Sequence, residues 1–159
     1  MSLINHRRRS ARWHGASQKV GQSAAPLFLD RIDIQCEISA LPFKELSKAA
    51  PGEPSAKIRE RVIAARALQT ARFKDVPGVH CNAQMTERMI HQYAEPDEQG
   101  LDLMRLAMER LSLSARAYSR ILKVARTIAD LDASDRVQPH HLAEAIGYRN
   151  LDRGDWAER

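Results

Sequence analysis

The chain has 159 residues, of which 43% are hydrophobic, 28% charged and 5% aromatic. This composition is typical of one globular domain with an aliphatic core, and the short apolar runs exclude a membrane-spanning helix of ~20 residues. The net charge of +5 does not by itself indicate nucleic-acid binding, because residues 1–24 hold five of the 25 basic residues and none of the 20 acidic ones. The remaining residues are neutral overall.

The first segment, residues 1–25, is basic, polar and without apolar periodicity, so we predict that it is disordered. Further along, residues 32–38 alternate between Ile or Cys and polar residues, which predicts a strand with one buried face. A single strand makes no sheet, so this segment either pairs with a strand outside the chain or packs as an extended arm. The prolines and glycine of residues 51–54 mark the start of a helical domain.

The rest of the chain shows helical periodicity with recognisable caps. Ser55 and Ser114 are suitable N-caps, the third helix is expected to start near Asp97, and Pro139 suits the first turn of a helix. We expect the first helix to bury a stripe of Ile58, Val62, Ala65 and Leu68. The fold class predicted is all-α, a four- to five-helix bundle preceded by an extended strand or arm. The expected helices span about 55–73, 82–94, 97–111, 114–131 and 139–147.

Motifs of autonomous catalysis are missing from the sequence. There is no G-x-x-x-x-G-K-[ST] loop, without which a P-loop enzyme has no cradle for phosphates. We therefore predict that this chain alone is not an enzyme. The group of His80, Cys81, His91 and the distant Cys36 lacks the paired spacing of a zinc site, so we predict no metal. The adjacent residues 140–141 are both His and open the last helix, where we expect capping or exposure.

Four collinear stretches together resemble the C-terminal part of magnesium-chelatase-like AAA+ ATPases, most closely the branch of competence proteins. The first, Phe28–Ile34, reads FLDRIDI, and Pro51–Val62 reads PGEPSAKIRERV. The third, Leu113–Leu131, reads LSARAYSRILKVARTIADL, and His141–Arg153 resembles the family's HLAEAIxYRxLDR ending. The resemblance covers Pro26–Arg153. Two positions depart from the family, since Ser112 replaces a usual glycine and Ser119 a usual aspartate.

The resemblance implies a division of the chain. Residues 26–54 would be a remnant of the ATPase core with a linker, 55–153 the helical lid domain, and 154–159 a tail. Arg31 matches the arginine finger, the catalytic residue that reaches a neighbouring subunit's nucleotide in trans. Arg116 matches the sensor 2 arginine, which contacts the γ-phosphate of ATP from the lid.

In function, the resemblance implies a lid that couples ATP binding and hydrolysis to DNA remodelling, such as branch migration during natural transformation. The cofactors implied are ATP and Mg²⁺, bound by the full-length protein rather than by this chain alone. The partners implied are the protein's own upstream ATPase core, neighbouring subunits of a homo-hexameric ring, and DNA, with no membrane involved. A cytoplasmic location is expected, because two cysteines form no disulfide framework. Two alternatives remain open: the lid of a metal-chelatase motor, and a free-standing helical interaction or DNA-binding module.

Overall fold

The computed structural model describes residues 31–36, 38, 42 and 51–149, and within these ranges all regular structure is helical. The all-α prediction is therefore confirmed. Residues 1–25, most of the segment from 26 to 50, and the tail from residue 150 lie outside the described residues. The helices are α3 (Ser55–Phe73), the short 3₁₀ helix η1 (Asn82–Gln84), α4 (Glu87–Tyr93), α5 (Glu98–Leu111), α6 (Ala115–Leu131) and α7 (Pro139–Gly147).

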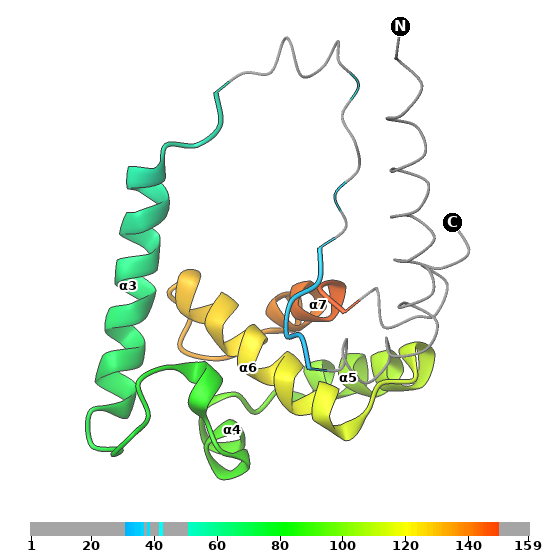
Figure 1. Ribbon diagram of the computed structural model, residues 1–159. Helices are drawn as coiled ribbons and strands as arrows, with labels where there is room; N and C mark the ends of the chain where they lie inside the picture. The colour runs from blue at the N-terminus through cyan, green and yellow to red at the C-terminus, as the bar shows by residue number, and fades with distance from the viewer. Residues whose placement is uncertain (1–30, 37, 39–41, 43–50, 150–159) are drawn as a thin grey trace, which may run out of the picture.

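Helix α6 lies at the centre of the fold and contacts α3, η1, α4 and α7 (Figure 1). Its buried side includes Ala117, Ala125 and Ala129, whose small side chains let neighbouring helices approach closely. Helix α7 packs on α6 and α5 through Leu142, which is fully buried. No helix in the described ranges combines the length and apolar character that crossing a membrane requires. The shared core comprises Phe73, Met85, Met89, Ile90, Ala94, Met104, Ile121, Leu122, Ala125, Ala129, Val137, Leu142 and Ala145.

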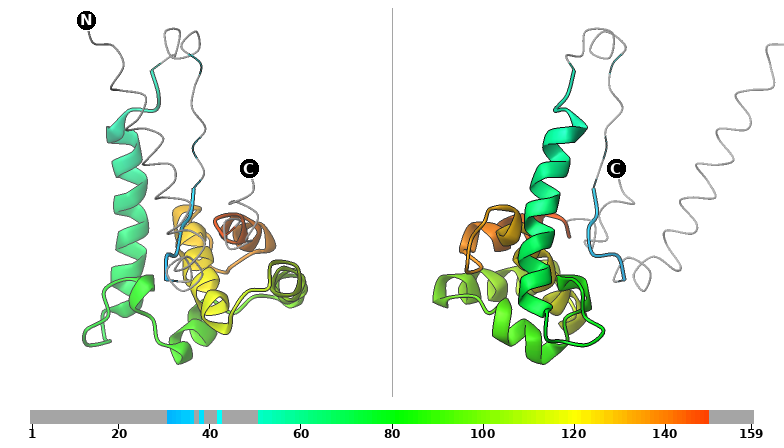
Figure 2. Two further views of the ribbon diagram at one scale, coloured as in Figure 1. Left: turned by 45° about the vertical axis from the view of Figure 1, so that its right-hand side comes forward. Right: turned by 90° about the vertical axis from the view of Figure 1, so that its left-hand side faces the viewer.

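Helix α3 packs on the bundle only through its C-terminal half, and its other half projects beyond it (Figures 1 and 2). Of the predicted stripe, Ala65 is buried, but the other three members are 43–47% exposed. The inward residues are instead Ala65, Gln69 and Phe73. The prediction of the buried stripe was therefore wrong at Ile58, Val62 and Leu68, because helical periodicity does not reveal how much of a helix has a partner to pack against.

The helix boundaries follow local capping chemistry closely. The Asp97 carboxylate accepts a hydrogen bond from the Gly100 N–H at 2.8 Å, and the Ser114 hydroxyl accepts one from the Ala117 N–H at 3.1 Å. Ser114 is the predicted N-cap, and Asp97 caps the helix that was predicted to start near it. Ser55 is instead the first residue of α3 and Pro54 occupies the cap. The predicted second helix is interrupted, because the backbone is extended at Thr86 and separates η1 from α4.

The predicted strand at 32–38 is an extended arm over residues 31–36, with no sheet among the described residues. Figure 2 shows it running beside the bundle, and the Gln35 N–H donates to the Tyr148 carbonyl at 2.9 Å. Ile34 and Ile38 are 51% and 91% exposed, whereas Gln35 is buried. The predicted apolar buried face was therefore wrong, because an alternating pattern buries its apolar side only when a second layer covers it.

Ser112 ends α5 in the left-handed conformation, with φ 50° and ψ 43°. A residue with a Cβ is strained there, whereas glycine is not, so glycine is common at the residue following a helix. This geometry explains why a glycine is usual at this position in the resembled family. Ser112 therefore lowers the stability of the fold through backbone strain that a glycine at this turn would not have.

We predict that Ser112→Gly raises the free energy of unfolding by about 0.5–1 kcal/mol, because relief of left-handed strain exceeds the added entropy of the unfolded chain. Urea denaturation followed by far-UV circular dichroism measures this change. Ala143→Gly, at an exposed position inside α7, is the control and should lower stability by a similar amount. A Ser112→Gly protein no more stable than the parent would contradict the strain argument.

Candidate functional site

A hollow of about 510 Å³ lies where α6 begins. It is bounded by α6, by α4 and η1, and by the arm of residues 31–36. Three cationic side chains of α6 reach it, accompanied by two carboxylates from other elements. Such a hollow suits an anionic ligand that several basic groups can contact together. Its lining consists of Asp33, Ala83, Glu87, Ala115, Arg116, Ser119, Arg120 and Lys123.

The basic residues meet because of their spacing on α6. Arg116, Arg120 and Lys123 are four and three residues apart, so they share one side of the helix. Ser114 caps the helix immediately before them, which places Arg116 in the first turn. The positive end of the helix dipole lies at this turn and adds to the attraction for an anion. Arg116 is exposed to solvent at this position.

The other basic side chains of the hollow are engaged within the protein. Arg120 donates to the carboxylate of Asp33 and, at 2.8 Å, to the carbonyl of Arg31. Lys123 donates to the Ala83 carbonyl at 3.0 Å. The acidic partner of Arg120 is therefore Asp33, which lies 87 residues away in the chain. These contacts fix the wall of the hollow beside Arg116.

The two arginines singled out by sequence lie in neighbouring parts of this region. Arg116 lines the hollow, whereas Arg31 lies at the start of the arm and is exposed. Only the main-chain carbonyl of Arg31 is bonded to α6, through Arg120. Ser119 donates to the Glu87 carboxylate at 3.0 Å across the hollow. The roles expected for Arg31 and Arg116 toward a nucleotide stay predictions.

A second polar cluster, which the sequence did not predict, is buried beneath α3. The Asp130 carboxylate accepts hydrogen bonds from Arg72 at 2.5 Å, from Asn82 at 2.7 Å and from Arg126 at 2.9 Å. Arg126 and Asp130 are 1% and 2% exposed. Arg126 also donates to the carbonyls of Ser134 and Asp135. Arg126 lies one helical turn from Asp130, whereas Arg72 is separated from it by 58 residues.

The charge of Asp130 depends on these neighbours. Burial would raise the pKa of its carboxyl group, but hydrogen bonds from Arg72 and Asn82 and the charges of both arginines outweigh it. The pKa of Asp130 is therefore lowered in the folded protein. Because the unfolded pKa is higher, the cluster's contribution to stability is present above about pH 4 and is lost as pH falls through the folded pKa.

We predict that Asp130→Asn lowers the free energy of unfolding by about 3 kcal/mol, because the guanidinium groups of Arg72 and Arg126 then lose the carboxylate that neutralises both of them. Urea denaturation at pH 7 measures this loss. Repeated below about pH 4, the same measurement should show a smaller difference between the two proteins. Asp75→Asn, at an exposed residue, is the control and should change stability by less than about 0.5 kcal/mol. An equal difference at both pH values would contradict the assigned ionisation of Asp130.

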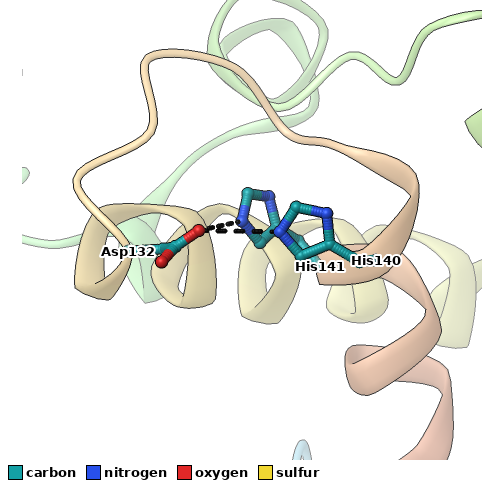
Figure 3. Close-up of side chains that lie close together, drawn as sticks. All are labelled: Asp132, His140 and His141. Carbon is teal, nitrogen blue, oxygen red and sulfur yellow. Dashed lines mark hydrogen bonds and ion pairs between the residues drawn. The ribbon is translucent and has the colours of Figure 1, made fainter.

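A third cluster joins Asp132 to the start of α7, where His140 and His141 lie side by side (Figure 3). The Nε2 atoms of His141 and His140 lie 3.2 Å and 3.6 Å from one Asp132 oxygen. These three side chains could approach a metal ion together. The Cys and His residues considered for a zinc site from the sequence form no such group within the described parts of the chain: Cys36, His80, Cys81 and His91.

The protonation of His141 opposes metal binding at this cluster. Its Nδ1 accepts the Gln138 backbone N–H at 2.9 Å, as part of a capping box that begins α7. Nδ1 therefore carries no proton, and the neutral ring carries its proton on Nε2, which donates to Asp132. A metal on Nε2 would require the proton to move to Nδ1 and break the cap. The expected capping role is confirmed for His141, while His140 is exposed.

We predict that ¹⁵N chemical shifts of the imidazole rings at pH 7.5 show His141 with Nε2 protonated and Nδ1 unprotonated. Adding equimolar Zn²⁺ should leave the His141 shifts unchanged, because ligation would cost the α7 cap. His140→Ala, which removes the exposed ring, is the control and should preserve the His141 pattern. A zinc-dependent shift of His141 Nε2 that is lost in Asp132→Ala would overturn this assignment.

Residues 52–149 match the family model described as magnesium chelatase, subunit ChlI C-terminal. The chain is 42% identical over 127 residues to the uncharacterized protein YifB of Escherichia coli, covering 79% of this chain and 24% of the relative. It is 39% identical over 127 residues to competence protein ComM of Haemophilus influenzae, with the same coverage. An uncharacterized Mycobacterium bovis protein is 30% identical over 130 residues, covering 82% of this chain and 25% of the relative. The chain thus spans about a quarter of the length of these curated relatives.

Proposed function

The chain belongs to the family of magnesium chelatase subunit ChlI C-terminal domains, and we propose that it serves as the helical lid of an AAA+ ATPase. The proposal is supported by the resemblance of its motifs to those of such ATPases and by the hollow at the start of α6. In this role the lid would cover ATP and Mg²⁺ bound to an ATPase core that precedes it. The chain has no phosphate loop, so the lid contributes side chains to a reaction that the core performs.

Arg116 is the residue proposed to contact the γ-phosphate of ATP. The observation that carries this assignment is its place in the first turn of α6, exposed and lining a hollow with Arg120 and Lys123. A guanidinium group binds phosphate oxygens through two parallel hydrogen bonds. Because Arg116 is fixed to a helix, release of the γ-phosphate would free α6 to change its angle to the core.

Arg31 is proposed to act in trans, on the nucleotide of a neighbouring subunit in a homo-hexameric ring. An arginine that contacts the transferring phosphoryl group stabilises its developing charge, an effect worth about 10³–10⁵ in rate in related enzymes. The exposure of Arg31 on the arm supports this role, because a finger must be accessible to another subunit. Its carbonyl bond to Arg120 holds the backbone while leaving the side chain able to reach outward.

We further propose that the ATPase remodels DNA, for example by branch migration during natural transformation in the cytoplasm. The support is the similarity to a relative named as a competence protein. The described residues supply no aromatic platform for stacking bases beside their basic groups, so the lid itself is not proposed to grip DNA. In this view the DNA contacts belong to the core of the ring.

The first test is the length of the natural polypeptide, measured by immunoblot of source cells with an antibody against residues 97–131. A lid joined to an ATPase core should give a polypeptide of about 500 residues, several domains long. A band of about 18 kDa alone would contradict the motor proposal. It would support the alternative of a free-standing helical interaction module.

We predict that, in the natural ATPase, Arg31→Ala lowers kcat at least about 10³-fold, because it removes charge stabilisation in the transition state. Arg116→Ala should raise the KM for ATP about tenfold or more, because it removes a phosphate contact. Steady-state ATP hydrolysis measures both. Arg110→Ala, in the last turn of α5 outside the hollow, is the control. Unchanged hydrolysis in both variants would sink the proposal.

A further inference from the structure

The arm of residues 31–36 is fastened to the helical bundle by two arginines and one main-chain bond. Arg120 of α6 donates to Asp33 and to the Arg31 carbonyl, and Arg149 donates to the Ile32 carbonyl. A further bond joins the main chains of Gln35 and Tyr148. The arm is thus held on one side by α6 and on the other by the residues that follow α7.

Of the contacts that hold the arm, those of Arg120 connect it to the helix that carries Arg116. Arg120 lies one helical turn beyond Arg116 on α6, and its partners, the Arg31 carbonyl and the Asp33 carboxylate, lie at the start of the arm. Its side chain is 27% exposed and that of Asp33 is 49% exposed. Such partial shielding strengthens an ion pair relative to one in open solvent, yet leaves it able to open without disrupting the core.

We propose that Arg120 is a positioning residue, which ties the backbone of Arg31 to the helix that carries Arg116. This inference rests on the proposed function, in which both arginines act on nucleotides. A tilt of α6 would then displace the arm, because one guanidinium nitrogen is bonded to both the side chain of Asp33 and the main chain of Arg31. The pair Asp33–Arg120 is called the clasp below.

The clasp gives a physical route between two nucleotides of a ring. Arg116 would respond to the nucleotide of its own subunit, and Arg31 would serve the nucleotide of the next one. A two-state movement of α6 biased at Arg116 would therefore reach the neighbouring active site through Arg120. When Arg116 contacts the γ-phosphate in its own subunit, Arg31 would be positioned at the nucleotide of the next subunit. This coupling favours hydrolysis in succession around the ring.

The clasp itself can be tested in this 159-residue chain without ATP. The Gln35 N–H donates to the Tyr148 carbonyl, which lies outside the arm. Exchange of this amide hydrogen with solvent, measured by NMR, therefore reports opening of the arm. Asp33→Asn and Arg120→Gln should each speed this exchange about three- to tenfold. The paired change Asp33→Arg with Arg120→Asp should recover part of the protection. Arg105→Gln removes the exposed ion pair with Asp102 elsewhere and should leave the Gln35 rate unchanged.

Two results in the isolated chain would overturn the clasp. One is a Gln35 exchange rate that neither single change alters, and the other is an equal acceleration in Arg105→Gln. Circular dichroism of each variant should retain the parent helix content, because Asp33 and Arg120 lie outside the buried core. A loss of helix in Arg120→Gln alone would leave Asp33→Asn to decide the outcome.

The coupling is tested in the natural ATPase. Arg120→Gln should lower kcat at least tenfold with less than a twofold change in the KM for ATP, because a displaced finger weakens only the transition state. The paired reversal should restore part of kcat. If Arg31→Ala lowers kcat but Arg120→Gln does not, the positioning role is wrong while the proposed function survives. If Arg31→Ala has no effect, the in-trans role proposed for Arg31 fails, and the clasp remains a structural contact with no finger to position.

Discussion

The fold depends on the buried carboxylate of Asp130 and the groups that neutralise it. A carboxylate removed from water is costly unless charges and hydrogen bonds satisfy it. Arg72 from α3, Asn82 from η1 and Arg126 from α6 do so together. Since these donors lie on three elements, the carboxylate is satisfied only when those elements meet in one arrangement. Apolar packing favours association of α3 with α6, and the charges then select how α3 sits on it.

Helix α6 carries three arginines whose surroundings differ along its length. Arg116 in the first turn is exposed, Arg120 is partly shielded, and Arg126 is buried. The role of each arginine therefore depends on how deeply it is buried. The exposed arginine can contact a ligand, the partly shielded one holds the arm, and the buried one stabilises the core. Because all three are on one rigid helix, forces applied at its start are transmitted to the arm and to the base of α3.

The sequence predicted those features that depend on neighbours in the chain. The bounds of α3 and α6 and the caps at Asp97 and Ser114 follow from residues a few positions apart, so local chemistry determined them. The hollow was missed, although the resemblance had singled out Arg116 within it. Finding the hollow requires knowing that the arm folds back onto α6, which no local pattern encodes.

The wrong predictions share the same physical origin. The apolar stripe of α3 and the alternation at 32–38 are both patterns of apolar residues along the chain, but neither pattern indicates whether anything covers those residues. The partners of Arg72 and Arg120 likewise lie 58 and 87 residues away. Charge pairs at such separations are determined by tertiary packing, and a single sequence gives no direct sign of them.

The projecting half of α3 makes this helix a mechanical lever with its pivot at Ala65, the first of its buried residues. About ten residues extend past the pivot, or ~15 Å at the usual helical rise. A tilt of ~10° at the base would move the tip by roughly 2–3 Å, about the length of a hydrogen bond. Arg61, within the projecting half, donates two hydrogen bonds to the carboxylate of Glu53, just before the helix, so Glu53 would move with α3. Small rotations inside the bundle are thereby enlarged where the helical domain joins the residues before it.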